Sequence, residues 1–260
     1  MANIITSKDN PVIRHYRKLC ENKRYRRTCK LFPAEGLRLV REAVQADNFG
    51  TVILTQSAYE KYAGEFAPDL VISDDLGRYI AETDHPQGVF CVCRMPELSL
   101  ETKPLSPDGR YLVTCDLQDP GNMGMILRTA DALGVDAVLS CKSCEVYSPK
   151  VVRATMGAIF RQRIYELGDI SSLSAALQGA SIRSYAAVLH KDAHFVTDCK
   201  LGTGCAVWIG NEGNGLSEEA VSACAEKLII PMQGNAESLN AAMAAGILMW
   251  EMMKGGTGDA

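Results

Sequence analysis

Short apolar runs separated by polar turns dominate the first hundred positions of the chain. Three of these runs predict β-strands, at residues 52–54, 70–72 and 89–93. The segments between them, 58–66 and 76–82, predict helices, and two further helices are expected before the first strand. Residues 96–110 then hold three prolines and no periodic apolar face, which predicts a linker at this point.

After this linker, strands and helices alternate regularly. Strands are expected at residues 111–115, 137–139, 184–189, 205–209 and 228–230. The first intervening helix is expected at 123–133, with Asn122 as its N-cap and Gly134 at its end. An alternation of this kind is typical of a parallel α/β sheet. The pattern therefore predicts a domain over 1–95, a linker over 96–110 and a larger α/β domain over 111–260.

The last helical segment differs from the others because it has almost no polar face. Residues 241–250 carry small and apolar side chains on every side, so a helix here must be buried in a core or against a partner. In the polar turn before it, Ser238 is the expected N-cap, whereas Asn240 has no obvious local role. A polar side chain in such a place indicates a ligand or a subunit contact.

Three polar loops each follow a predicted strand: residues 119–124, 210–215 and 231–240. Ligands of parallel sheets bind beyond the carboxyl ends of the strands, so these loops are expected to form one site. Loop 210–215 has three glycines but lacks the lysine of a phosphate-binding loop, and its acid, Glu212, suits a cationic or hydroxyl-bearing ligand. No Gly-x-Gly-x-x-Gly motif follows a first strand, which argues against a nucleotide-dependent oxidoreductase.

Charge changes this picture in the first thirty residues. The whole chain has a net charge of −4, but nine basic residues face two acidic ones here, a local charge of +7. Such an imbalance indicates nucleic-acid contact, although a solvated helix face gives the same pattern. The candidate RNA-binding residues are Arg14, Arg17, Lys18, Lys23, Arg24, Arg26 and Arg27. Tyr16 and Tyr25 lie among them and are candidates for base stacking.

Composition indicates the cellular compartment of the protein and whether it binds a metal. No apolar run reaches membrane-spanning length, and the first ten residues lack the apolar core of a signal peptide, so a cytoplasmic protein is expected. The ten scattered cysteines are then expected to be reduced. Cys141 and Cys144 have redox or zinc spacing but no second ligand pair, so no metal is expected.

The chain resembles the SpoU (TrmH) family of RNA ribose 2′-O-methyltransferases, within the SPOUT superfamily. Its signature motifs are matched, in order, by residues 119–130, 208–217 and 237–250. Residues 4–42 and 85–88 resemble the start and the end of the family's ribosomal-protein-like substrate-binding domain, and 147–157 resembles the middle of its methyltransferase domain. One departure is Ala241-Ala242-Met243, where valine and serine are commoner, and it keeps the small apolar character. The resemblance covers nearly the whole chain.

This resemblance implies a fold, a cofactor and an assembly. The expected fold is a parallel-sheet α/β methyltransferase domain with a deep trefoil knot, preceded by a smaller α/β domain that binds the RNA substrate. The expected cofactor is S-adenosylmethionine, and a homodimer is expected to form through the C-terminal domain. The implied cofactor-binding residues are Gly210, Ile230, Met232, Ser238 and Leu239. Lys150 and Arg153 are expected to contact the RNA backbone.

The resemblance also implies a catalytic set: Arg128, Asn122, Glu212, Ser238 and Asn240. The resemblance implies that this arginine deprotonates the ribose 2′-hydroxyl, and the alternative is that it acts as a clamp for the substrate phosphate. A guanidinium with a pKa above ~12 resists deprotonation, which favours the clamp. Asn122 and Glu212 are expected to hold this arginine and the nucleotide. Ser238 and Asn240 are expected to orient the ribose or the cofactor. Without the resemblance, Arg128 is an ordinary helix arginine that extends to solvent.

The expected activity is therefore 2′-O-methylation of ribosomal RNA. The same chemistry on transfer RNA is the alternative among enzymes, and a non-catalytic RNA-binding protein is the alternative outside them. The sequence leaves open which nucleotide is modified. It also leaves open whether the modification is a housekeeping one or protects the ribosome against an antibiotic.

Overall fold

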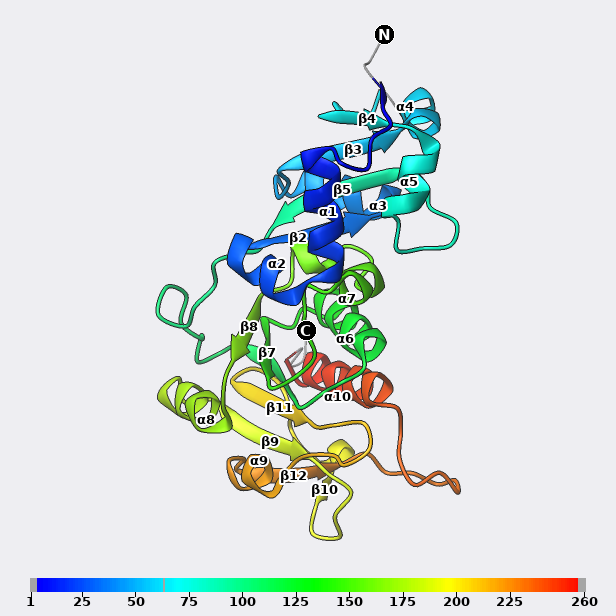
Figure 1. The fold of residues 1–260 in the computed structure, drawn as a ribbon. Coiled ribbons are helices and arrows are strands. Elements are labelled where there is room, and N and C mark those ends of the chain that lie inside the picture. The colour runs from blue at the N-terminus through cyan, green and yellow to red at the C-terminus, as the bar shows by residue number, and fades with distance from the viewer. Residues whose placement is uncertain (1–3, 63, 257–260) are drawn as a thin grey trace. The chain divides into compact units, whose positions relative to one another are not determined.

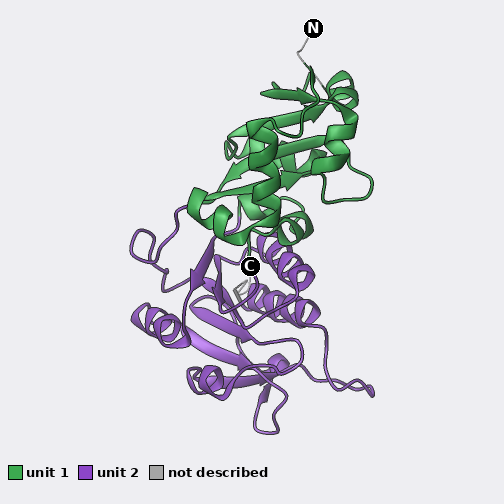
Figure 2. Ribbon diagram, viewed as in Figure 1, with its two compact units in different colours: residues 1–96, 145–161 green, residues 97–144, 162–260 purple. Residues whose placement is uncertain are grey.

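The computed structural model describes residues 4–62 and 64–256. The chain divides into two compact units: unit 1 holds residues 1–96 and 145–161, and unit 2 holds residues 97–144 and 162–260 (Figure 2). The division after residue 96 lies at the start of the predicted linker. Segment 145–161, which the sequence pattern placed in the second domain, instead packs with unit 1.

Unit 1 contains a five-stranded mixed sheet in the order β1-β4-β3-β5-β2 (Figure 1). Its strands are β1 (Ile4–Ile5), β2 (Leu31–Glu35), β3 (Thr51–Thr55), β4 (Leu70–Ile72) and β5 (Val89–Arg94). β5 is antiparallel to β2 and β3, and the other pairs are parallel. The sequence pattern predicted the three central strands and missed both edges. β1 has only two residues, and β2 contains Pro33, which a strand tolerates at the edge of a sheet.

The helices of unit 1 are α1 (Pro11–Glu21), α2 (Lys23–Cys29), α3 (Leu37–Gln45), α4 (Gln56–Tyr62), α5 (Asp74–Ile80) and α7 (Pro149–Ala154), with a 3₁₀ turn at Ala158–Phe160. α1 buries Ile13, Tyr16 and Leu19 in the core of the unit. Tyr16 is 1% exposed, and its hydroxyl donates to the Ala34 carbonyl at 3.2 Å. Base stacking by Tyr16 was therefore a wrong expectation, because the ring lies in the core.

Segment 145–161 is held to unit 1 at both of its ends. Glu145 pairs with Arg26 of α2, and Arg161 pairs with Glu42 of α3. Two aromatic residues of the segment also contact Phe32 of β2. The Phe32 ring centroid lies 5.1 Å from that of Tyr147 and 5.9 Å from that of Phe160. Two ion pairs and an aromatic cluster therefore explain why this segment packs with unit 1.

Unit 2 contains a seven-stranded sheet in the order β10-β12-β9-β11-β6-β7-β8, and every pair in it is parallel. The strands are β6 (Arg110–Cys115), β7 (Ala137–Cys141), β8 (Ile164–Leu167), β9 (Arg183–Ala187), β10 (His194–Phe195), β11 (Cys205–Ile209) and β12 (Glu226–Ile229). The predicted parallel α/β fold is confirmed. β8 and β10, which lie at the two edges of the sheet and are short, were not predicted.

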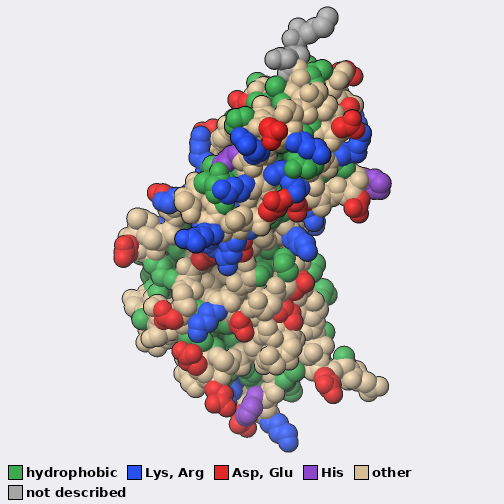
Figure 3. Space-filling view, in the orientation of Figure 1, with side chains coloured by type: hydrophobic (Ala, Val, Ile, Leu, Met, Phe, Trp, Pro, Cys, Tyr) green, Lys and Arg blue, Asp and Glu red, His purple; other side chains and the backbone are tan. Residues whose placement is uncertain are grey.

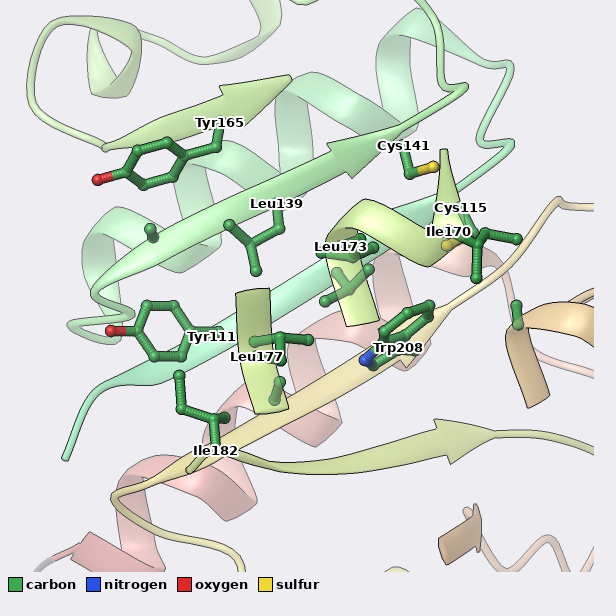
Figure 4. Close-up of a cluster of buried hydrophobic side chains, with 14 residues drawn as sticks. Tyr111, Cys115, Leu139, Cys141, Tyr165, Ile170, Leu173, Leu177, Ile182 and Trp208 are labelled. Carbon is green, nitrogen blue, oxygen red and sulfur yellow. The ribbon is translucent and has the colours of Figure 1, made fainter. Parts of the chain in front are cut away.

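The helices of unit 2 are α6 (Pro120–Ala132), α8 (Ile170–Gly179), α9 (Glu218–Ser222) and α10 (Ala241–Gly256), with a 3₁₀ turn at Val196–Asp198. α10 packs against α6 and also contacts β6 and β11. α8 covers a buried cluster that includes Tyr165, Leu173 and Trp208 (Figure 4). Helices thus cover the sheet, and the loops at its carboxyl edge form the candidate site. In the described ranges, no helix is long and apolar enough to cross a membrane.

Two helix caps differ from the predicted ones. α6 begins at the proline after Asp119, whose Oδ1 accepts the N–H of Asn122 at 2.7 Å, so Asp119 is the cap and not Asn122. Proline suits the first helical position, which explains the earlier start. α10 begins after Asn240, whose Oδ1 accepts two N–H groups of the first turn at 2.9 and 3.2 Å. Ser238, the expected cap, lies three residues before the first residue of this helix.

Candidate active site

A cavity of about 800 Å³ lies at the carboxyl ends of β9, β11 and β12 in unit 2. Small-molecule sites in proteins typically have volumes of ~300–1,000 Å³. The wall comes from the loops after these three strands and from the first turns of α10. It includes all five predicted cofactor-binding residues: Gly210, Ile230, Met232, Ser238 and Leu239. The structure therefore gathers around one cavity positions that lie up to 29 residues apart along the chain.

The glycine loop after β11 is a tight turn that needs glycine at its first position. A Cβ on Gly210 would lie 2.1 Å from the backbone carbon of Gly215, closer than atoms can approach. Asn211 and Gly215 exchange backbone hydrogen bonds of 2.9 Å in both directions, and Gly215 has a φ of +67°. The Asn211 side chain closes the turn, because its Oδ1 accepts the N–H groups of Gly213 and Asn214. The backbone in this part of the cavity wall is therefore preorganised.

Three of the predicted catalytic side chains form one chain of hydrogen bonds. Asn240 Nδ2 donates to Asn122 Oδ1 at 2.9 Å, and Asn122 Nδ2 donates to Glu212 Oε1 at 3.1 Å. These residues come from the cap of α10, the first turn of α6 and the glycine loop. The three loops that the sequence predicted to form one site are therefore joined by direct side-chain bonds.

The direction of each bond in this chain follows from its neighbours. Asn240 Oδ1 already accepts two backbone N–H groups, so its amide nitrogen is the donor toward Asn122. Asn122 accepts with its oxygen and donates with its nitrogen to Glu212. The Glu212 carboxylate also accepts the backbone N–H groups of Gln118 at 3.1 Å and Asp119 at 2.9 Å. These three donors are best satisfied when Glu212 is ionised.

The pKa of Glu212 reflects the same contacts. Burial alone would raise its pKa, but the hydrogen bonds from Asn122 and from the Asp119 and Gln118 backbones outweigh burial and hold the pKa below its ordinary value. A carboxylate with a low pKa and engaged lone pairs accepts protons weakly near neutral pH. In this geometry Glu212 is suited to orienting Asn122 and not to general base catalysis.

Arg128 and Ser238 lie apart from this chain of hydrogen bonds. Arg128 is exposed on α6, and within the described ranges no protein group bonds to its guanidinium. Asn122 and Glu212 bond to each other, which corrects the expectation that they hold the arginine. An exposed guanidinium of this kind is accessible to a substrate phosphate. Ser238 is exposed in the wall of the cavity.

Most predicted RNA-binding residues lie on the surface of unit 1. Figure 3 shows Lys and Arg side chains gathered over α1 and α2. The exposed ones are Arg14, Lys18, Lys23, Arg24, Arg27 and, on α7, Lys150. Arg17 is partly exposed, pairs with Glu21, and has its guanidinium 5.1 Å from the centroid of the Tyr79 ring. This surface has the charge that a polyanion requires.

Arg26 does not belong to this surface, which corrects its prediction as an RNA contact. Its side chain is 5% exposed, and Nε and Nη2 bond to the two carboxylate oxygens of Glu145 at 2.9 and 2.5 Å. Its third nitrogen donates to the carbonyls of Leu19 and Cys20 at the end of α1. All three nitrogens are engaged inside unit 1. No sequence pattern predicts this role, because Glu145 lies 119 residues away along the chain.

Arg153 is also placed differently from the exposed basic residues. It is half-buried and lines a cavity of about 10 Å³ together with Glu35 and Glu82. A space of this size holds about one water molecule. An RNA contact by Arg153 stays a prediction, and its two acidic neighbours offer the guanidinium an alternative partner inside the protein.

Tyr25 keeps its place as a candidate for base contact. Lys18 Nζ lies 4.1 Å from the Tyr25 ring centroid, and His15 Nδ1 lies 2.8 Å from the Tyr25 hydroxyl. Burial and, after it, the charge of Lys18 lower the pKa of His15, which favours the neutral ring near pH 7. No sequence pattern indicates this contact of His15, because its partner lies ten residues away on the next helix.

Two family descriptions match most of the chain. Residues 109–250, more than half of the chain, match the SpoU rRNA Methylase family. Residues 10–91 match the MRM3-like substrate binding domain. The stretch between the two matches contains most of the linker predicted at 96–110.

Similar proteins have this arrangement over almost their whole length. The 23S rRNA (guanosine(2553)-2′-O)-methyltransferase RlmP of Bacillus subtilis (strain 168) is 29% identical over 252 residues, which cover 95% of this chain and 98% of that protein. An AdoMet-bound rRNA methyltransferase from Sinorhizobium meliloti matches with a TM-score of 0.84 at 27% identity, covering 96% and 97% of the two chains. A crystal structure of an RNA 2′-O ribose methyltransferase matches with a TM-score of 0.83 at 30% identity, covering 97% and 99%. The chain described here belongs to the SpoU rRNA methylase family.

Proposed function

We propose that this protein transfers a methyl group from S-adenosylmethionine to the 2′-hydroxyl of a ribose in ribosomal RNA. The observation that carries the proposal is a cavity with the five predicted cofactor positions in its wall and the Asn240–Asn122–Glu212 chain beside it. Relatives named as 23S rRNA 2′-O-methyltransferases, from Bacillus subtilis and Streptomyces viridochromogenes, support ribosomal RNA as the substrate.

The cavity wall fits a nucleoside that carries a positive charge. Ile230, Leu239 and Leu248 provide apolar surface for a flat base, and the glycine loop allows the backbone to approach a ligand closely. Glu218 and Glu237 also lie in the wall, where carboxylates favour a cation. When bound, S-adenosylmethionine supplies an electrophilic methyl group on its sulfonium.

The residues of the chain act by positioning in this proposal. Arg128 binds the phosphate beside the target ribose, with a guanidinium that stays charged at every working pH. Asn240 and Glu212 fix the orientation of Asn122, and each asparagine amide keeps a second N–H for the nucleotide. Placing the 2′-hydroxyl in a reactive geometry then supplies much of the rate acceleration.

RNA binding is assigned to unit 1, as the match of residues 10–91 to a substrate binding domain supports. We assign residues 1–95, together with segment 145–161 that packs with them, to this role, and the rest of residues 111–260 to the methyltransferase domain. The exposed basic residues of α1 and α2, with Lys150 of α7, contact phosphates, which carry no sequence information. Recognition of the target nucleotide therefore depends on other contacts, for which Tyr25 is a candidate.

The homodimer is proposed to form through α10 and α6. Met243 and Trp250 lie two turns apart on α10 and are 63% and 50% exposed, and Met125 on α6 is 46% exposed. The two helices pack against each other, so these apolar side chains belong to neighbouring elements. Large apolar side chains grouped in this way mark an interface. A second copy of the chain is the proposed occupant, because a two-fold axis brings the same apolar surface together from both copies.

Two further proposals follow from the family. The C-terminal segment is proposed to form the trefoil knot of the SPOUT superfamily, since the chain belongs to a family with this fold. A ribosomal RNA substrate also makes the cytoplasm the proposed place of action.

Transfer RNA is the second candidate substrate. A structure described as giving insights into 2-OH methylation of C/U34 on tRNA matches with a TM-score of 0.53 at 27% identity, over 58% of this chain. The substrate binding domain matched by residues 10–91 favours the ribosomal candidate. A non-catalytic RNA-binding protein is the weaker alternative, since it would have no need of the Asn240–Asn122–Glu212 chain.

The test is transfer of radiolabelled methyl groups from S-adenosylmethionine to unmodified ribosomal and transfer RNA, followed by nucleoside analysis. We expect label in a 2′-O-methylated nucleoside of ribosomal RNA. Label in transfer RNA alone would replace the proposed substrate. Cofactor binding without label would direct the assay to assembled ribosomal particles. Failure to bind the cofactor would overturn the enzymatic proposal.

A further inference from the structure

Arg26 and Glu145 form a buried ion pair in unit 1 that the proposed chemistry does not use. Their side chains are 5% and 7% exposed, and two hydrogen bonds of 2.9 and 2.5 Å join them. Removing two charges from water is costly, and apolar side chains of similar size often give equal stability. Stability alone therefore does not explain the pair, and a role in positioning neighbouring segments is the alternative.

One end of the pair lies in a helix that is proposed to bind RNA. The exposed neighbours of Arg26 on α2 are Lys23, Arg24 and Arg27. Arg26 itself turns inward and also donates to two carbonyls at the end of α1. It therefore ties both basic helices to Glu145.

The residues just before Glu145 support the loop 116–119 in unit 2. The Cys144 N–H donates to the Leu117 carbonyl at 2.7 Å. Ser143 Oγ accepts the Leu117 N–H at 3.1 Å. These bonds hold Leu117 from both of its backbone groups, so the position of residues 143 and 144 sets the position of the loop.

The same loop sets the position of Glu212. The two residues after Leu117 donate their backbone N–H groups to the Glu212 carboxylate, which orients Asn122 and lies in the cavity wall. Cys144 and Glu145 are consecutive, so a planar peptide bond connects the ion pair to the support of this loop. These hydrogen bonds and the peptide bond between residues 144 and 145 together connect Arg26 on α2 to the Glu212 carboxylate.

We infer that the Arg26–Glu145 pair is a positioning element that couples RNA binding on α2 to the geometry of loop 116–119. The inference rests on the proposed function. RNA bound to α2 favours the arrangement in which Glu145 and the loop hold Glu212 in its place. Because coupling between binding sites is reciprocal, RNA and the cofactor each raise the affinity of the other while the pair is intact.

Glu145→Gln is the first test, since it keeps the shape of the side chain and one acceptor while removing the charge. We expect kcat on an unmodified 23S ribosomal RNA transcript to fall by about 2- to 30-fold, the range of such coupling effects, with little change in KM. The Tm should also fall, because Arg26 loses the charge of its buried partner. By calorimetry, the transcript should raise the affinity of the wild-type protein for S-adenosylhomocysteine. The variant should lose this gain.

Glu42→Gln is the matched control. It breaks the Arg161–Glu42 pair, which lies at the other end of segment 145–161 and within the same unit. We expect this variant to keep the wild-type kcat and the wild-type gain in cofactor affinity. Equal losses in both variants would mean that a general loosening of unit 1 is responsible, and would overturn the inference.

A second variant covers the case in which Glu145→Gln does not fold. The double variant Arg26→Met/Glu145→Leu replaces the buried pair with apolar side chains, and should melt near the wild-type Tm while still lacking the coupling. If the coupling survives in a folded variant, this inference is wrong and the proposed function is unaffected. A wild-type protein that binds neither S-adenosylhomocysteine nor RNA would instead defeat the proposed function.

Discussion

At the scale of single residues, the site combines a fixed hydrogen-bonded set with one exposed cation. Asn122 bonds to Asn240, 118 residues later, and to Glu212, 90 residues later, so its orientation is set before any substrate arrives. Arg128 lies six residues after Asn122 with its guanidinium exposed. Polar groups that are already oriented stabilise developing charge best. Arg128 adds to this set a positive charge that can bind the substrate phosphate.

The first prediction concerns Arg128→Ala. Methyl transfer should fall by at least about 10²-fold, because the substrate phosphate loses its charged donor. Affinity for S-adenosylhomocysteine should stay within a few-fold, since Arg128 lies outside the described wall of the cavity. Methyl-transfer assays and calorimetry on the same preparation check both statements. Arg128→Lys keeps the charge but loses the two-pronged contact, so it should retain partial activity. A collapse of cofactor affinity would instead make Arg128 a cofactor contact.

The second prediction concerns the pH dependence of stability at Glu212. The pKa of Glu212 is lowered from an ordinary value of 4.5, so its ionised form stabilises the fold above that pH. This stabilisation is lost as the pH falls through the folded-state pKa. Glu212→Gln lacks it throughout, so the wild-type Tm should fall more steeply than that of the variant between about pH 5 and pH 3. Parallel curves from a thermal melting series would contradict the proposed role of the three hydrogen bonds.

At the scale of helices and loops, two N-caps place the side-chain amides of Asn122 and Asn240 in the site. Asp119 caps α6 and thereby leaves the Asn122 side chain free to bond elsewhere, while Asn240 caps α10 with its oxygen and reaches Asn122 with its nitrogen. For each helix, the residue predicted as the cap and the residue observed as the cap are both of types that suit this position, because Asp, Asn and Ser all do. Only the path of the backbone decides between them, so neither cap could be predicted with certainty from the chain alone.

The third prediction separates these two tasks of Asn240. Asn240→Ala removes the cap and should cost about 1 kcal/mol of unfolding free energy as well as activity. Asn240→Asp keeps a capping oxygen, and its charge favours the helix N-terminus, so it should be more stable than the alanine variant. It cannot donate to Asn122, however, so activity should fall in both variants. Urea unfolding and methyl transfer provide the comparison, and wild-type activity in the aspartate variant would show that the donated bond is dispensable.

At the scale of the whole molecule, sequence patterns predicted the strands that alternate strongly and missed what depends on distant partners. The parallel order of unit 2 followed from its alternation of strands and helices. The packing of segment 145–161 with unit 1 did not, because Glu145 and Arg161 find their partners more than a hundred residues earlier. Leu239 shows the same limit at the site, since pattern alone makes it a core leucine and only the family motif assigns it to the cofactor.

The last prediction concerns the proposed dimer, whose formation can be followed by the fluorescence of Trp250. It has two tryptophans, and Trp208 is fully buried with an Nε1 that finds no acceptor within the described ranges. Trp208→Phe should be tolerated, because it removes an unsatisfied donor, and it leaves Trp250 as the only tryptophan. If α10 forms the interface, Trp250 emission should shift to the red on dilution, with the same midpoint as the loss of dimer mass in sedimentation. Trp250→Glu should be monomeric at micromolar concentration, whereas Phe195→Glu, at a 52% exposed position on β10, should stay dimeric. A dimer that survives Trp250→Glu would place the interface elsewhere and leave the apolar surface of α10 for another partner.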